Sequence, residues 1–209
     1  ARDRPLSLVR ELGFLPLNSR AEFEYLIRFL KQEEMGSEYV EDEIAIAEEY
    51  FPPGEAEEVI ALLRGRAELL DVISRCDVCR LALNDEEGYP YILPLNFGEK
   101  DVDGQLTLYF HGAMEGKKYE LMEKDPRASF EMDCSHELFM NDEKMSCTMK
   151  YESVIGRGRL ELVPEEEKEE ALAILMRHYH QEDFPFGRAA MPKTKVFRLV
   201  VEQMTGKRR

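Results

Sequence analysis

A glycine and two lysines, Gly116-Lys-Lys118, stand where a helix is predicted to begin, directly after two alternating strands. Backbone N–H groups in the first turn of a helix have no partner inside the helix, and the helix dipole favours negative charge there. Glycine lets the backbone approach a ligand closely. The pattern predicts a site for a phosphate-sized anion, with an ordinary surface helix as the simpler alternative.

Three polar residues could extend such a site. His111 ends a predicted strand just before Gly112, Asn96 lies on the strand before it, and Ser153 lies on a later strand. An imidazole with an ordinary pKa of about 6.5 can deliver a proton near neutrality. An amide can donate to and accept from the edge of a flat polar ring. Residue spacing leaves open whether these side chains meet in one chain or across two, and a solvated histidine is the simpler alternative for His111.

The elements that must position these residues are mostly strands. Residues 89–98 alternate, with Tyr91, Leu93, Leu95 and Phe97 on one face, and residues 105–112 alternate as well. Further strands are predicted at 78–84, 127–133, 146–163 and 195–201, and helices at 67–75, 117–124 and from Pro164 onward. Residues 136–145 are predicted to form a loop. Short strands joined by short turns favour an antiparallel barrel over a parallel sheet.

Residues 1–65 are predicted to form an acidic α-helical N-terminal extension, and residues 66–209 the barrel domain. Ser19-x-x-Glu22 is a capping box, and apolar residues behind it recur at helical spacing. The extension is interpreted as a stabilising or dimer-widening element, with a lid or partner-docking subdomain as the alternative.

Composition limits the classes of partner. The chain has 209 residues, 44% of them hydrophobic, and a formal net charge of −15. An acidic chain is a poor partner for nucleic acid or an anionic membrane, and the basic end Lys207-Arg-Arg209 is interpreted as a solvated tail. No apolar run reaches roughly 18 residues, so no membrane helix is expected. The absence of an apolar leader and the few cysteines predict a cytoplasmic protein.

Four cysteines occur, and Cys76-x-x-Cys79 forms a C-x-x-C pair. A thioredoxin-like motif would stand between a strand and a helix, whereas here a helix precedes and a strand follows. A structural zinc site would usually need a second close pair, and Cys134 and Cys147 are too far apart for that. Reduced structural cysteines are therefore predicted, with zinc and redox chemistry as the alternatives, and no metal site is expected.

Four ordered runs of the sequence resemble the nitroimidazole-resistance (Nim) proteins of the pyridoxamine 5′-phosphate oxidase-like group. The resemblance spans roughly residues 66–209 and does not cover residues 1–65. The runs are Cys76-Asp-Val-Cys-Arg-Leu-Ala-Leu83, Gly88-Tyr-Pro-Tyr-Ile-Leu-Pro-Leu-Asn-Phe-Gly98, Leu108-Tyr-Phe-His-Gly-Ala-Met-Glu-Gly-Lys117 and Thr148-Met-Lys-Tyr-Glu-Ser-Val-Ile-Gly156.

The resemblance implies a split β-barrel that binds FMN, as a homodimer with a flavin at each subunit interface. By position, the flavin ring and ribityl chain would be lined by Pro94, Leu95, Asn96 and Phe97, then by Phe110, His111 and Gly112. The phosphate would be held by Gly116, Lys117 and Lys118. Tyr151, Ser153 and Val154 would reach a flavin, either that of their own subunit or the one shared with the other subunit. His111 would lie near the reacting face and is the candidate catalytic residue.

The leading hypothesis is an FMN-dependent oxidoreductase that passes electrons from a reduced donor to a small acceptor such as a nitroaromatic. The alternatives are a flavin- or heme-binding module without turnover and an interaction protein that uses the helical extension. Vitamin B6 oxidation is not expected, because the chain has no Trp and ends in Met204-Thr-Gly-Lys-Arg-Arg. Pyridoxamine phosphate oxidases end instead in a strand with a Trp and an Arg-Leu-x-Pro tail.

Overall fold

The computed structural model describes residues 65–102, 104–141, 145–181 and 191–208. The predicted helical extension lies outside the described residues, apart from its last position. Residues 65–70, 102 and 104 belong to one compact unit, and the other described residues to a second unit that holds the sheet. None of the described helices is long and apolar enough to cross a membrane.

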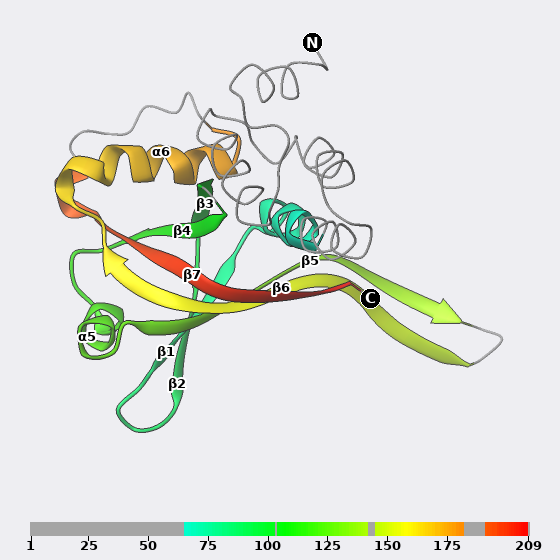
Figure 1. The fold of residues 1–209 in the computed structure, drawn as a ribbon. Helices are drawn as coiled ribbons and strands as arrows, with labels where there is room; N and C mark the ends of the chain where they lie inside the picture. The colour runs from blue at the N-terminus through cyan, green and yellow to red at the C-terminus, as the bar shows by residue number, and fades with distance from the viewer. Residues whose placement is uncertain (1–64, 103, 142–144, 182–190, 209) are drawn as a thin grey trace, which may run out of the picture. The chain divides into compact units, whose positions relative to one another are not determined.

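An antiparallel sheet dominates the second unit (Figure 1). Its seven described strands are β1 (Cys79–Asn84), β2 (Pro90–Leu95), β3 (Phe97–Val102), β4 (Gln105–Gly112), β5 (Arg127–Asn141), β6 (Ser146–Leu162) and β7 (Lys195–Arg208). The helices are α5 (Lys117–Lys124) and α6 (Lys168–His178), the 3-10 turns η2 (Glu165–Glu167) and η3 (Met191–Lys193), and a helix at 65–74. The prediction of a mainly β, antiparallel fold with added helices is confirmed.

Asn96 is the corner at which the sheet turns back on itself. The strand order is β2-β1-β5-β6-β7-β4-β3, so β2 and β3 stand at opposite ends of the sheet. The two strands are nevertheless separated by Asn96 alone. Two strands joined by one residue cannot be far apart at that corner, so the sheet must curl until its ends meet. This arrangement fits the split barrel that the resemblance implies.

The apolar side chains that alternate along the strands fill the interior, as predicted. In β4, Leu106, Leu108 and Phe110 are buried, and the residues between them are not. Phe110 stacks on Phe197 of β7 with ring centroids 5.3 Å apart. Phe97 is fully buried as well. Strands with one buried face and one exposed face are typical of antiparallel sheets.

Helix α6 covers β3 and β4 closely. A Cβ atom at Gly98 would lie 2.5 Å from Leu175 Cα, so only glycine lets the helix backbone approach the strand. Leu172 and Leu175 are buried as predicted, and Met176 and Tyr179 are half-buried.

Three predicted boundaries were wrong. The single strand predicted at 89–98 is broken at Asn96 into β2 and β3, because the chain passes there from one end of the sheet to the other. The predicted loop at 136–145 is largely strand, because β5 continues to Asn141 and pairs with the first residues of β6. Beyond Glu137 these two strands pair only with each other among the described residues, and they extend past the sheet as an arm (Figure 1). The predicted solvated tail at Lys207 and Arg208 is the end of β7, paired with Ser153 and Glu152 of β6.

Candidate functional site

Helix α5 begins at Lys117, as predicted, and Gly116 is its N-cap residue. Gly116 has φ 146°, a region that side chains disfavour, and no side chain caps the helix. The N–H of Tyr119 bonds the Gly116 carbonyl oxygen at 3.0 Å. The N–H groups of Lys117 and Lys118 precede that first bond and therefore remain available to an anion.

Four residues form a cradle beside this helix end, and we call Gly112, Lys118, Tyr119 and Lys195 the anion cradle. A Cβ atom at Gly112 would lie 3.0 Å from both Lys118 Nζ and Tyr119 Oη, so the missing side chain lets these groups converge. Lys195 is the register partner of Gly112 across the β4–β7 ladder. The Nζ atoms of Lys118 and Lys195 each lie 4.5 Å from the centre of the Tyr119 ring.

The electrostatics of the cradle favour an anionic ligand. Burial and the nearby charge of Lys195 lower the pKa of Lys118. No acidic partner for either lysine occurs among the described residues. The Tyr119 hydroxyl is buried without a hydrogen-bond partner in that same part of the chain, and burial raises its pKa to about 12. A protonated hydroxyl and two cations are donors that suit a phosphate.

The side chain of Lys117 is engaged elsewhere. Its Nζ forms an ion pair with Asp85 and lies 5.3 Å from the centre of the Tyr91 ring. Only the backbone N–H of Lys117 is therefore free for the cradle. Sequence inspection missed Tyr119 and Lys195, because no local pattern joins Lys195 to a helix so far away in the chain.

The residues predicted to line a flavin ring on β2 and β3 lie around the Asn96 corner. Asn96 Nδ2 donates to Tyr179 Oη at 3.4 Å, and the Phe97 N–H donates to the same oxygen at 3.2 Å. Pro94 is exposed and Leu95 half-buried. The Phe97 side chain is in the core, where its ring lies 4.2 Å from that of His178. Only backbone atoms of Phe97 could therefore face a ligand.

Phe110 and His111 point to opposite faces of β4. The Phe110 ring is buried in the core, and the His111 side chain is exposed. Desolvation by the surrounding protein still lowers the pKa of His111. The imidazole is therefore mostly neutral at pH 7 and lies one residue before Gly112 of the anion cradle.

The third predicted group, Tyr151, Ser153 and Val154, lies at the other end of β7. Ser153 pairs with Lys207, whereas His111 pairs with Val196. About 11 steps of roughly 3.3 Å separate these positions, or up to roughly 36 Å along β7. The structure thus does not bring Ser153 and His111 together within one chain. Tyr151 Oη accepts a hydrogen bond from Lys207 Nζ at 3.3 Å, and Val154 is buried.

Comparison with known proteins assigns the family. The family described as pyridoxamine 5′-phosphate oxidase matches residues 65–208. The chain belongs to this family. No curated protein matches the sequence. Within the described residues, no group of three or more His, Cys, Asp or Glu side chains could hold a metal ion.

Solved structures of similar fold include a proposed 5-nitroimidazole antibiotic resistance protein from Bacteroides thetaiotaomicron. It is 34% identical, with a TM-score of 0.58, over 66% of this chain and 81% of that one. An FAD and heme binding protein from Mycobacterium smegmatis matches at 17% identity and a TM-score of 0.59, over 68% of this chain and 70% of that one. The flavocytochrome Anf3 from Azotobacter vinelandii is 18% identical, with a TM-score of 0.57, over 68% of this chain and 65% of that one. The last two similarities concern the fold alone.

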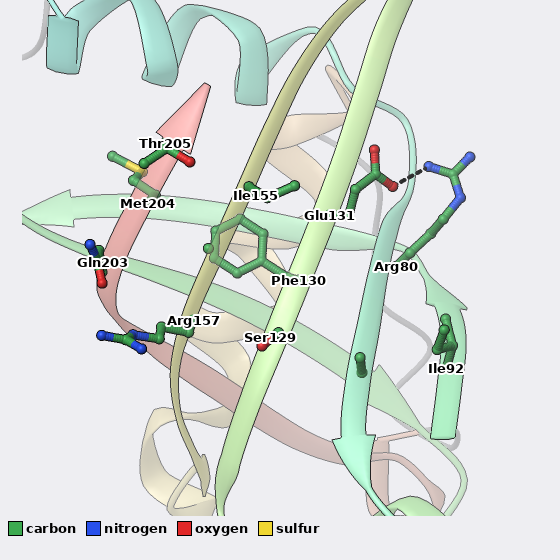
Figure 2. A pocket seen from close by; sticks show the side chains of 12 residues that line it. Arg80, Ile92, Ser129, Phe130, Glu131, Ile155, Arg157, Gln203, Met204 and Thr205 are labelled. Carbon is green, nitrogen blue, oxygen red and sulfur yellow. Dashed lines mark hydrogen bonds and ion pairs between the residues drawn. The ribbon is translucent and has the colours of Figure 1, made fainter. Parts of the chain in front are cut away.

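This member of the pyridoxamine 5′-phosphate oxidase family also has a hollow of about 530 Å³ on its sheet (Figure 2). Its walls come from β1, β2, β5, β6 and β7. Ile92 and Ile155 line it with 61% and 55% of their surface exposed, next to Met204. The Arg80–Glu131 ion pair, 3.0 Å long, stands at its edge. Exposed isoleucines on a sheet face are typical of a surface that another apolar surface covers.

Proposed function

We propose that this protein is an FMN-dependent oxidoreductase of the Nim type. It would pass electrons from a reduced donor, such as a nicotinamide, to a small acceptor, such as a nitroaromatic. The anion cradle is the observation that carries the proposal. It offers two cations and a hydroxyl without a hydrogen-bond partner among the described residues, at a helix N-terminus. Membership of the family and 34% identity to a proposed nitroimidazole resistance protein support it.

Bound FMN would supply the two-electron chemistry, and the chain would supply binding and orientation. Lys118 and Lys195 would hold the phosphate, with Tyr119 Oη and the N–H groups of Lys117 and Lys118 as further donors. His111, on the same stretch of β4 as Gly112, would hold or release a proton beside the reacting atoms. Its lowered pKa makes the neutral ring the main form near neutrality.

A second copy of the chain would complete the site. His111 and Ser153 lie opposite Val196 and Lys207, near opposite ends of β7. In a homodimer, Tyr151 and Ser153 of one subunit can face the cradle of the other, whereas the Val154 side chain is buried in its own subunit. The exposed Ile92 and Ile155 around the sheet hollow give such a dimer an apolar surface to bury.

The experiment that tests the proposal compares FMN with riboflavin, which lacks the phosphate. Full-length protein should bind FMN with visible flavin bands and bind riboflavin at least about 100-fold more weakly, since charge-assisted bonds to phosphate are lost. Anaerobic NADH or NADPH should bleach the bound flavin, and a nitroaromatic should restore its colour. Equal affinity for FMN and riboflavin would show that the anion cradle does not bind the FMN phosphate. A Soret band with heme and no flavin bands would favour the heme-binding alternative.

A further inference from the structure

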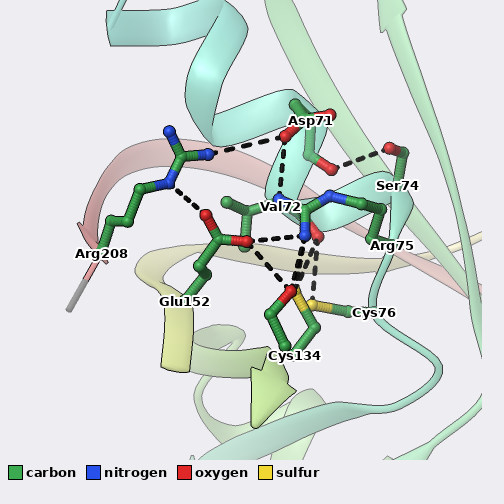
Figure 3. Close-up of polar contacts among 9 residues, drawn as sticks. Asp71, Val72, Ser74, Arg75, Cys76, Cys134, Glu152 and Arg208 are labelled. Carbon is green, nitrogen blue, oxygen red and sulfur yellow. Dashed lines mark hydrogen bonds and ion pairs between the residues drawn. The ribbon is translucent and has the colours of Figure 1, made fainter. Parts of the chain in front are cut away.

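Two cysteines outside the anion cradle converge on one backbone carbonyl (Figure 3). Cys76 Sγ lies 3.2 Å from the carbonyl oxygen of Val72, and Cys134 Sγ lies 4.0 Å from the same atom. This shared partner keeps the two sulfurs no more than about 7 Å apart. Rotation about the Cα–Cβ bond of either residue can shorten that gap.

A bulge in β5 turns the chain at Cys134. The register with β6 shifts between Cys134 and Glu137, and Ser135 has φ 57°, which is unusual for a residue other than glycine. Bulges of this kind re-aim side chains. Here the bulge presents Cys134 and Ser135 to Arg75, because Arg75 Nη1 donates to Ser135 Oγ at 2.8 Å and to Cys134 Sγ at 3.6 Å.

Arg75 is fixed in this position by two acids. Its guanidinium bonds Glu152 at 2.6 Å and Asp71 at 2.8 Å. Arg75 thereby holds a hydrogen-bond donor beside the Cys134 sulfur. Cys134 is partly exposed, whereas Cys76 is only 1% exposed. Burial and the neighbouring Cys134 raise the pKa of Cys76 to about 12, so Cys76 is the protonated second partner.

We propose that Cys134 and Cys76 form an oxidisable thiol pair that a hydroperoxide converts to a disulfide. Cys134 Sγ attacks one peroxide oxygen, the O–O bond breaks, and the thiol proton passes to the leaving oxygen, so that a sulfenic acid and an alcohol or water result. The Cys76 sulfur then displaces the hydroxyl as water and loses its proton. In sum, two thiols are oxidised by two electrons, and the peroxide is reduced.

This pairing differs from the one that the C-x-x-C spacing suggests. Cys79 lies on the buried face of β1 with no exposed surface, and burial raises its pKa strongly. Cys147 is exposed on the β5–β6 arm, away from the other three. A bond between Cys76 and Cys134 would tie the chain after the 65–74 helix to β5. It would form beside Glu152, the neighbour of Ser153 in β6.

The test is peptide mapping of the full-length protein after hydrogen peroxide, with free thiols alkylated before trypsin. Residues 76–80 should appear joined to residues 128–144, with fragmentation placing the bond at Cys76. Cys79→Ala should keep this cross-link, and Cys134→Ser should abolish it. Arg75→Gln should slow its formation roughly tenfold. Arg80→Gln, which removes an arginine held by Glu131 and Asp133, should leave the rate of cross-link formation unchanged.

Thermal unfolding gives an independent measurement on the unmutated chain. The oxidised protein should unfold at a higher temperature than the reduced one, because the bond closes a long loop, and dithiothreitol should reverse the shift. A disulfide within residues 76–80, sulfinic acid at Cys134 with Cys76 still reduced, or unchanged thiols at both positions would each overturn the proposal.

Discussion

At its first residue, β7 places Lys195 beside Tyr119 and Lys118, and no acid among the described residues neutralises either lysine. At the other end of β7, Arg208 forms an ion pair with Glu152, and Lys207 bonds Tyr151. One strand thus carries cations in two opposite settings. In the first, like charges gather around a hydroxyl that has no hydrogen-bond partner in the part of the chain that the structure describes. In the second, each cation has a partner.

This difference separates a binding site from a structural one. Like charges held together raise the free energy of the folded chain, and a buried hydroxyl without a partner raises it further. A ligand that carries negative charge relieves both. The cluster at Glu152 gains nothing from a ligand, because Arg75, Arg208 and Ser135 already satisfy its carboxylate. Substitutions at the two ends should therefore affect different measurements.

The largest expected effect is on FMN affinity when both cradle lysines are removed. Lys118→Ala combined with Lys195→Ala should raise the Kd for FMN by about 100-fold or more, because two charge-assisted contacts are lost. Flavin fluorescence titration measures it. Lys124→Ala, which removes a cation from the far end of α5 where it pairs with Glu86, is the matched control and should leave Kd within about twofold. Equal losses in both variants would show that Lys118 and Lys195 have no special role in binding FMN.

The next effect is on stability, at the end of β7 where Lys207 and Arg208 have partners. Glu152→Gln should lower the free energy of unfolding by about 1–2 kcal/mol, because the carboxylate is 14% exposed and holds two arginines. Glu161→Gln, whose carboxylate is 49% exposed on Arg198, should cost less than about 1 kcal/mol. Urea unfolding gives both values.

The same carboxylate predicts an acid-dependent loss of stability. Hydrogen bonds from Arg75, and then from Arg208 and Ser135, lower the pKa of Glu152 to about 2 from an ordinary value near 4.5. A depressed pKa stabilises the folded state above the unfolded pKa, and this stability is lost as pH falls from about 4.5 toward 2. Over this pH range, the free energy of unfolding of Glu152→Gln should depend less steeply on pH than that of the unmutated protein. An unchanged slope would mean that other carboxylates control it.

Tyr119→Phe should act in opposite directions on stability and on binding. Without ligand, removing a buried hydroxyl that has no partner should leave the protein as stable or more stable, by up to about 1 kcal/mol. With FMN, loss of one donor should raise Kd roughly threefold to tenfold. Thermal melting with and without FMN records both signs. A destabilised apoprotein would show that the hydroxyl is already bonded.

The smallest effect concerns His111. Its lowered pKa means that the protonated ring becomes common only below the ordinary value of about 6.5. If His111 delivers a proton, turnover should rise severalfold as pH falls through that pKa, and His111→Gln should remove the dependence while FMN still binds. A pH profile of kcat measures it. An identical profile in the variant would assign the proton to another group.

Much of the fold could be predicted because its signals are local. Alternation predicted β4 and the part of the 89–98 run that forms β2, and the Gly116-Lys-Lys118 motif predicted the start of α5. The break at Asn96 between β2 and β3 was missed, because the alternation of apolar residues continues through it. The ends of β5 and β7 were missed, because polar residues such as His136 and Lys207 give no strand pattern. They are held in strands by the neighbouring β6, which sequence spacing does not reveal.

Only part of the candidate site could be predicted from the sequence, for the same reason. Gly116 and Lys118 lie in one local motif, which a helix start makes recognisable. Lys195 reaches the cradle through the β4–β7 ladder, and Tyr119 matters because of its burial rather than its type. Lys117 was an equal candidate until Asp85 was seen to hold it. Pairing partners distant in sequence decide these assignments.

The position of β7 in the sheet also constrains when the protein can first work. β7 is the last strand in chain order, yet it lies between β6 and β4, with Thr107 opposite Val200. A growing chain on the ribosome therefore cannot complete the sheet, or bring Lys195 to Lys118, until β7 has emerged. Contacts between such distant segments also make folding slow. Flavin added during synthesis should thus bind to and stabilise only those chains in which β7 has already emerged from the ribosome.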